Sequence, residues 1–169
     1  MTLVEPLMQS LAHSVARALL RSGTTLTTAE SCTGGLIAAA CTAVAGSSDW
    51  FERGFVSYSN AAKIEALGVD AALIAAHGAV SGEVARAMAA GALRHSHADI
   101  AVAVTGIAGP GGATPGKPVG TVWLAWARRG SPAQAELLSL SGDRSAVREQ
   151  AVVHALRRIL ALAESAGAA

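Results

Sequence analysis

Apolar residues in the first part of the chain recur at intervals of three and four positions, the spacing of one face of an α-helix. The series Met8, Leu11, Val15 and Leu19 follows this spacing and predicts a helix over Leu3–Arg21. Apolar periodicity, alanine content and N-cap residues predict further helices over Thr33–Val44, Asn60–Leu67, Asp70–His77, Ser81–His97 and Asp143–Ala163.

Short runs of apolar and β-branched residues between these helices predict strands. They cover Thr24–Ala29, Gly54–Tyr58, Asp99–Thr105, Val119–Ala127 and Ala133–Leu140, and the segment Arg128–Pro132 is typical of a hairpin turn. Elements in this order predict an α/β fold, a three-layer α/β/α sandwich with a mixed, mostly parallel sheet. Because no linker or internal repeat interrupts the pattern, residues 1–169 are expected to form a single domain.

Composition and charge exclude several classes of protein. Hydrophobic residues make up 51% of the chain and charged residues 15%, which excludes a disordered chain. Thirteen basic residues stand against twelve acidic ones without a basic run, so nucleic acid is not an expected partner. Charged residues interrupt every long apolar stretch, so neither a membrane span nor a signal peptide is expected. Two cysteines are too few for a disulfide framework, and the expected location is the cytoplasm.

The segment Thr28–Gly35 carries the first candidate for catalysis. Ser31 lies where a predicted strand turns into a predicted helix, a place where α/β proteins present side chains to ligands. Free N–H groups at the helix start could hold an oxyanion or a phosphate. Two alternatives stay open, because Ser31 could be an ordinary helix cap and Cys32 beside it could be the nucleophile.

Tyr58 and Lys63 form the second candidate group. Lys63 is one of two lysines, and a desolvated lysine can act as a base near pH 7 whereas arginine cannot. A tyrosine at a strand end and a lysine one turn into the next helix can converge on one cavity. Spacing alone fits a solvated lysine and an edge tyrosine better, and it leaves Ser59 as another possible nucleophile.

The glycine- and proline-rich loop Gly106–Pro118 follows a predicted buried strand. Its N–H groups could cradle a phosphate or a carboxamide, or the loop could be a flexible crossover. It matches neither a Walker loop nor a dinucleotide-binding fingerprint. The histidines and cysteines show no metal-ligand spacing, so we expect no metal and no cofactor. His77, in a loop-like context, leaves a Ser-His-Asp triad open.

Seven motifs in this order resemble the CinA C-terminal family, nicotinamide-nucleotide amidases also known as competence/damage-inducible proteins. They are TTAESCTGG, GSSDWF, GFVSYSNAAK, HGAVSGEVARAMAAGAL, IAVAVTGIAGPGG, KPVGTVW and GDRSAVREQAV, and the resemblance covers the chain from about residue 5 to 162. The resemblance implies hydrolysis of the carboxamide of nicotinamide mononucleotide to nicotinate mononucleotide and ammonia. Longer family members carry an additional N-terminal domain that resembles molybdopterin-binding proteins, and this sequence starts directly with the helix before TTAESCTGG.

The resemblance also implies residue roles. Ser31 would be the nucleophile, Lys63 the base, and Tyr58 a proton-relay or orienting group. The expected substrate-binding residues are Cys32, Thr33 and Gly34 around the oxyanion, and Asn60, Thr105, Gly106 and Arg144, with Arg148 as a further candidate for the phosphate.

Two other functions stay open, a non-catalytic nucleotide-binding domain and a protein-interaction module linked to competence or DNA damage. The expected assembly is a homo-oligomer, most simply a dimer. A glycine-rich loop and three tryptophans in a weakly charged chain suggest buried contact surface.

Overall fold

The computed structural model describes residues 4–167, and its elements follow the predicted order. The helices are α1 (Val4–Ser22), α2 (Leu36–Thr42), α3 (Asn60–Leu67), α4 (Ala71–His77), α5 (Gly82–Arg94) and α6 (Arg144–Ala166), with a 3₁₀ turn, η1, at Ser47–Asp49. The strands are β1 (Leu26–Glu30), β2 (Phe51–Val56), β3 (Ile100–Gly106), β4 (Thr121–Arg128) and β5 (Gln134–Ser139). Leu3, the predicted start of the first helix, lies outside the described residues.

The five strands form one sheet in the order β2-β1-β3-β4-β5. β1 pairs with β2 and β3 in parallel, whereas β4 is antiparallel to both β3 and β5. β4 therefore runs against the other four strands, which confirms the prediction of a mixed, mostly parallel sheet.

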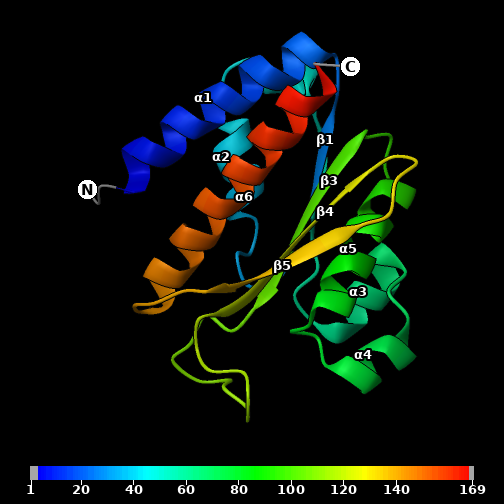
Figure 1. The fold of residues 1–169 in the computed structure, drawn as a ribbon, viewed down its shortest axis with the longest axis vertical. Helices are drawn as coiled ribbons and strands as arrows, with labels where there is room; N and C mark the ends of the chain where they lie inside the picture. The colour runs from blue at the N-terminus through cyan, green and yellow to red at the C-terminus, as the bar shows by residue number, and fades with distance from the viewer. Residues whose placement is uncertain (1–3, 168–169) are drawn as a thin grey trace.

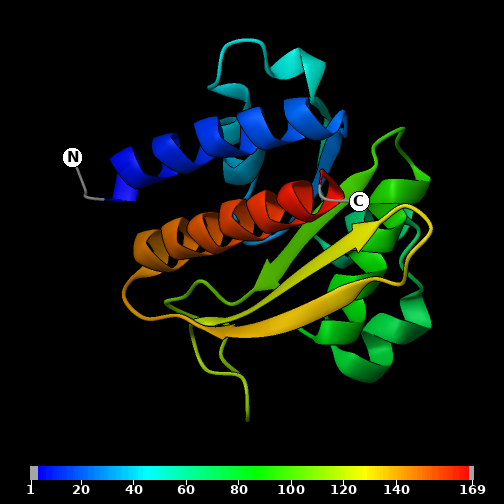
Figure 2. The same cartoon turned by 45° about the horizontal axis from the view of Figure 1, so that its top comes forward.

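Helices cover both faces of this sheet. Figure 1 shows α1, α2 and α6 on one side and α3, α4 and α5 on the other, and the turned view in Figure 2 shows α1 lying alongside α6. The predicted three-layer α/β/α sandwich is confirmed. Because β1, β2 and β3 are parallel, their carboxyl ends meet at one edge of the sheet, where α/β folds bind ligands.

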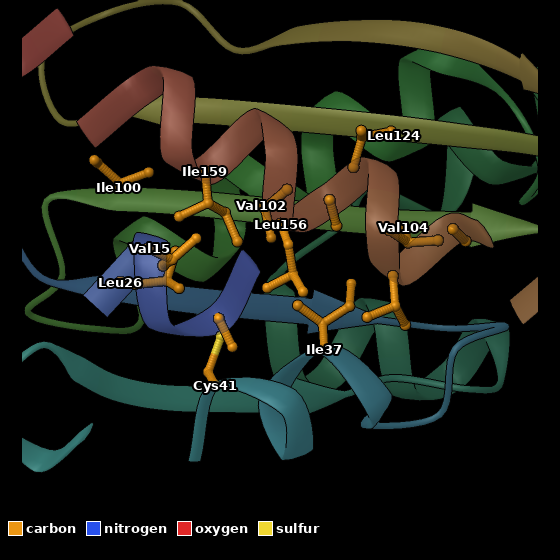
Figure 3. Packing of buried hydrophobic residues seen from close by; sticks show 14 of the residues in the cluster. Val15, Leu26, Ile37, Cys41, Ile100, Val102, Val104, Leu124, Leu156 and Ile159 are labelled. Atoms are coloured by element: carbon orange, nitrogen blue, oxygen red, sulfur yellow. The ribbon is translucent and has the colours of Figure 1, made fainter. Parts of the chain in front are cut away.

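The two faces of the sheet carry side chains of different size. On β3, Ile100, Val102 and Val104 face α1 and α6 in a cluster of large apolar residues (Figure 3). The alternate residues Ala101 and Ala103 face α5 in a cluster rich in alanine. Small side chains on this second face let α5 lie close to the backbone of the sheet.

Gly91 shows how closely the helices on the alanine face pack. A Cβ atom built on Gly91 of α5 would lie 2.0 Å from the carbonyl oxygen of Leu67 at the end of α3. No side chain fits at that distance, so glycine is required at this helix crossing.

Most helix and strand boundaries differ from the predictions by one to three residues, and three of these differences have a clear physical reason. The helix predicted from Thr33 begins at Leu36, because Gly34 and Gly35 have φ angles of +60° and +99°, which helical residues do not adopt. The strand predicted at Gly54–Tyr58 is Phe51–Val56, since its register with β1 ends at the pair of Glu30 with Val56. The helix predicted to reach His97 ends at Arg94, where the His95 ring nitrogen lies 2.9 Å from the Gly91 carbonyl oxygen.

Candidate active site

A pocket of about 210 Å³ lies at the shared carboxyl edge of β1, β2 and β3. Ser31 follows β1 directly, Tyr58 follows β2 after one intervening residue, and Thr105 lies near the end of β3. The pocket is lined by Ser31, Cys32, Tyr58, Asn60, Lys63, Ala79, Val80, Thr105, Gly106, Ala108 and Arg144. Eight of the ten residues predicted from the sequence as site residues are therefore brought to one place.

Ser31 and Lys63 are in direct contact, although they are far apart in the sequence. The Lys63 Nζ atom lies 3.0 Å from the Ser31 Oγ atom. The same nitrogen donates to the carbonyl oxygens of Ser57 at 3.1 Å and Tyr58 at 3.0 Å. With two N–H bonds directed at these carbonyl oxygens, the lone pair of the neutral amine is left to face the serine hydroxyl, which is the geometry of a nucleophile paired with its base.

Lys63 is buried, with 1% of its surface exposed, and its three hydrogen-bond partners carry no formal charge. Burial lowers the pKa of Lys63 from its ordinary value, and the opposite influence of the Cys32 thiol is smaller. Since a lysine acts as a base only when neutral, burial shifts the amine toward the form that can take the Ser31 proton.

The turn after Ser31 offers few free N–H groups. The Ser31 N–H donates to Val104, and the Gly34 N–H donates back to the Ser31 carbonyl oxygen. Within residues 4–167, the N–H groups of Cys32 and Thr33 donate to no other residue, and of these two only Cys32 lines the pocket. Thr33 and Gly34, two of the expected substrate-binding residues, do not line this pocket: Thr33 is buried, and the Gly34 N–H donates to the Ser31 carbonyl oxygen.

The two rival nucleophiles have other roles in the structure. Cys32 is buried, and burial raises the pKa of its thiol to about 11, which keeps it protonated near neutral pH. The Ser59 Oγ atom caps α3 by accepting the Ala62 N–H at 3.0 Å. Among the three candidates, Ser31 is the one whose nucleophilic atom contacts the Lys63 amine.

Tyr58 contacts Lys63 through its backbone carbonyl and Arg144 through its hydroxyl. Its carbonyl oxygen accepts from Lys63, whereas its hydroxyl oxygen accepts from the Arg144 guanidinium at 2.9 Å. Arg144 also donates to the Gly109 carbonyl oxygen at 2.9 Å and thereby connects the start of α6 to the glycine-rich loop. This geometry favours an orienting role for Tyr58 over a proton relay, because the phenol bonds to the arginine and not to Ser31 or Lys63.

Thr105, Gly106 and Asn60 complete the pocket. The buried Thr105 hydroxyl donates to the Ala79 carbonyl oxygen at 2.9 Å, which ties β3 to the segment before α5. A Cβ atom on Gly106 would lie 2.7 Å from the Val122 side chain, so glycine is needed for the strand to pass there. Asn60 is exposed at the first position of α3, and its side chain is free to meet a ligand.

Comparison with known proteins places this architecture in one family. The model of the CinA C-terminal domain matches residues 8–163. The chain belongs to the CinA C-terminal domain family. It is 52% identical to nicotinamide-nucleotide amidohydrolase PncC of Escherichia coli K12 over 152 residues, which cover 90% of this chain and 92% of that protein. Its fold matches the crystal structure of competence/damage inducible protein CihA from Agrobacterium tumefaciens with a TM-score of 0.91 and 44% identity, over 96% of this chain and 99% of that one.

CinA-domain proteins differ in length. The chain is 57% identical over 159 residues to a competence-damage inducible protein of Symbiobacterium thermophilum, and this match covers 89% of the chain but 37% of that relative. The CinA domain is thus found both as nearly the whole of one relative and as a minor part of another.

The rest of the described chain bears on four other possibilities: a metal site, a membrane-spanning helix, a histidine near Ser31 and a second cavity. The described part of the chain has no cluster of three or more histidine, cysteine, aspartate or glutamate residues that could hold a metal ion, and none of its helices is long and apolar enough to cross a membrane. His77 lies at the end of α4, 3.8 Å from Glu83, and not beside Ser31. A larger cavity of about 460 Å³ between α1, α2 and α6 contains neither Ser31 nor Lys63.

Glu30 is the residue that sequence reasoning missed. Its side chain is buried, and its two oxygens accept the N–H groups of Ile37 at 2.8 Å and Ala38 at 3.0 Å, at the start of α2. The helix N-terminus expected to hold an anionic ligand is therefore already occupied. The available signal was a carboxylate at the end of an otherwise uncharged strand, directly before the proposed nucleophile.

Proposed function

We propose that the chain hydrolyses the carboxamide of nicotinamide mononucleotide, releasing ammonia and nicotinate mononucleotide. The 3.0 Å contact between Lys63 Nζ and Ser31 Oγ in a pocket at the sheet edge carries this proposal, because it supplies a nucleophile and a base. The PncC name of the relative that this chain covers almost end to end supports the choice of substrate.

Catalysis begins when neutral Lys63 takes the hydroxyl proton of Ser31 and the serine oxygen attacks the carboxamide carbon. The tetrahedral oxyanion then accepts a hydrogen bond from the Cys32 N–H, which lies beside Ser31 in the pocket wall and donates to no other described residue. Lys63 passes its proton to the leaving nitrogen, the C–N bond breaks, and ammonia departs from an acyl-serine. Lys63 then takes a proton from a water molecule, the resulting hydroxide attacks the ester, and Lys63 returns the proton to the Ser31 oxygen as nicotinate mononucleotide leaves.

The size of the pocket limits what it encloses. At about 210 Å³, it is smaller than the roughly 300–1,000 Å³ typical of sites that bury a whole drug-sized ligand. We therefore place the pyridine carboxamide in the pocket and the ribose phosphate at its mouth. Arg144 lies there, exposed and already oriented by Tyr58 and Gly109, and a guanidinium is well matched to a phosphate.

Ammonia release from nicotinamide mononucleotide by the purified chain tests this function, with Ser31→Ala as the decisive variant. Loss of the nucleophile should lower kcat by several orders of magnitude, roughly 10⁶-fold in a comparable serine hydrolase. Folding should persist, because the Ser31 hydroxyl caps no helix and contacts only Lys63 and the Tyr58 carbonyl. A wild-type chain that releases no ammonia at any pH would refute the proposed activity, and an active Ser31→Ala variant would refute the proposed nucleophile.

We also propose that the chain works as a dimer in the cytoplasm. The tryptophan argument for the dimer weakens, since Trp50 is buried and Trp126 packs under the Arg158 guanidinium at 3.9 Å. Exposed apolar side chains at Val56, which ends the edge strand β2, and at Leu36 now support it. Light scattering at micromolar concentration tests the dimer, and a monomer would refute it.

A further inference from the structure

The turn Ser31–Gly35 is held from two sides by charged side chains that the proposed reaction does not use. On one side, the buried Glu30 side chain accepts the Ile37 and Ala38 N–H groups. On the other side, Arg148 of α6 donates from Nε to the Cys32 carbonyl oxygen at 3.1 Å and from Nη2 to the Thr33 carbonyl oxygen at 3.2 Å. Two of these four hydrogen bonds reach the turn itself, and the other two join the residue before the turn to the first residues of α2.

Each contact has a direct consequence for the turn. Gly34 and Gly35 have positive φ and lie between Ser31 and α2, so the backbone bonds of the turn are those of Gly34 to Ser31 and of Leu36 to Thr33, not the i to i+4 bonds of an α-helix. Glu30 precedes Ser31 and bonds to the helix that follows the turn, which sets the distance between the two ends. A side chain on Gly34 would begin 3.5 Å from Arg148 Nη2, so the guanidinium lies directly against the turn.

The bonds also determine which way the peptide groups of the turn point. In a trans peptide, the carbonyl and the N–H point in opposite directions. Arg148 holds the carbonyl oxygens of Cys32 and Thr33 toward α6, and the Ser31 carbonyl accepts the Gly34 N–H. With these three carbonyls fixed, the peptide planes on both sides of Cys32 have little freedom to rotate.

We propose that Glu30 and Arg148 act as positioning residues that hold the turn Ser31–Gly35, and so fix the direction in which the Cys32 N–H meets the reacting carboxamide. The proposal rests on the proposed amidase function. Neither side chain lines the pocket, so neither is expected to touch the substrate. Both act through the turn, and their loss should change the chemical step more than substrate binding.

Glu30→Gln and Arg148→Lys test this hold with little change in volume. Glutamine replaces one accepting oxygen with an NH₂ group, so one of the two α2 N–H groups loses its partner. Lysine cannot span two carbonyl oxygens in the way that the planar guanidinium does. We expect kcat for ammonia release to fall roughly 100-fold in each variant, the effect of about 1 Å of misplacement, with KM changed far less.

Matched controls separate positioning from general effects of charge and folding. Glu164→Gln and Arg157→Ala alter exposed residues of α6 far from the turn in sequence and should keep wild-type kcat. The pH of half-maximal activity should stay at the wild-type value in Glu30→Gln and Arg148→Lys, since the hydrogen-bond partners of Lys63 are unchanged. Active sites are counted by serine labelling, so that kcat refers to folded enzyme.

Hydrogen exchange gives a readout that needs no substrate. Peptides covering residues 31–40 should exchange faster in Glu30→Gln and Arg148→Lys than in the wild-type chain, while peptides from β3 and β4 should not. The positioning role would be overturned if both variants kept the wild-type kcat. It would also be overturned if kcat/KM fell only because KM rose. Absence of ammonia release by the wild-type chain would instead overturn the proposed function, and unchanged exchange over residues 31–40 would still overturn the hold on the turn.

Discussion

Replacing Lys63 with methionine removes the proposed base while keeping an unbranched side chain of similar length. Ser31 would then face no proton acceptor, because the Lys63 amine at 3.0 Å is the basic group in contact with its hydroxyl among the described residues. General-base catalysis contributes about 10²- to 10⁴-fold, so kcat for ammonia release should fall by at least that factor. Lys63→Arg should be nearly as inactive, since arginine keeps the charge but does not become neutral near pH 7.

The same substitution has a cost in stability. Lys63 donates to the carbonyl oxygens of Ser57 and Tyr58, and methionine leaves both without this donor. An unsatisfied buried acceptor costs about 1–3 kcal/mol, partly offset here because an amine no longer has to be buried. A net loss of about 2 kcal/mol lowers Tm by roughly 4–8 °C in a chain of this size.

The dependence of this difference on pH has a definite sign. Burial lowers the pKa of Lys63 in the folded protein, so the unfolded chain binds this proton more tightly. The wild-type free energy of unfolding, relative to that of Lys63→Met, should therefore rise with pH between the lowered pKa and the ordinary value of about 10.4. The kcat for ammonia release should increase as the pH rises through the lowered pKa of Lys63, because the neutral amine forms there.

Ammonia assays and thermal denaturation across this pH range provide the measurements. A Lys63→Met or Lys63→Arg variant with near-normal kcat would show that the lysine only positions the substrate. A stability difference that stays constant with pH would show that Lys63 titrates as it does in the unfolded chain, and the reasoning from burial would be wrong.

Three further substitutions probe separate parts of the structure. Cys32→Ala should keep most of the turnover, because the protonated thiol does not react and the backbone N–H remains. An inactive Cys32→Ala variant would instead indicate that Cys32 is the nucleophile. Tyr58→Phe should raise KM roughly tenfold, since a hydrogen bond to a charged group contributes about 1.5 kcal/mol, and a loss confined to kcat would favour the proton relay instead. Gly91→Ala should destabilise the chain by about 3 kcal/mol in denaturant titration despite the higher helix propensity of alanine, and an unchanged midpoint would contradict the close contact with Leu67.

The sequence predicted the fold and most of the pocket because both follow from local patterns. Apolar periodicity located the helices, and the rule that parallel strands end at one edge brought Ser31, Tyr58 and Thr105 to the same place. Ser81 and Asp143 cap α5 and α6 as expected, through the N–H groups of Val84 and Ala146.

The missed features depend on packing and on the path of the backbone, which the spacing of apolar residues does not reveal. Spacing alone could not show that Lys63 would be buried against Ser31, because that burial comes from packing around α3. Glu30 was overlooked because a carboxylate is rarely buried, and its partners at Ile37 and Ala38 exist only once the two glycines have bent the chain. The helix start at Leu36 follows from the same bend.

The alanine-rich face of the sheet also bears on how this domain can change over evolutionary time. Leucine, isoleucine and valine on the α1 and α6 side can adopt new rotamers when a neighbour changes, so substitutions there can compensate one another. Ala101, Ala103 and Ala125 on the α5 side have no rotamers to change, and any added methyl group must move a backbone. Sequences descended from a common ancestor should therefore diverge more slowly along the α5 layer than along the α1 and α6 layer, even at positions that never touch a substrate.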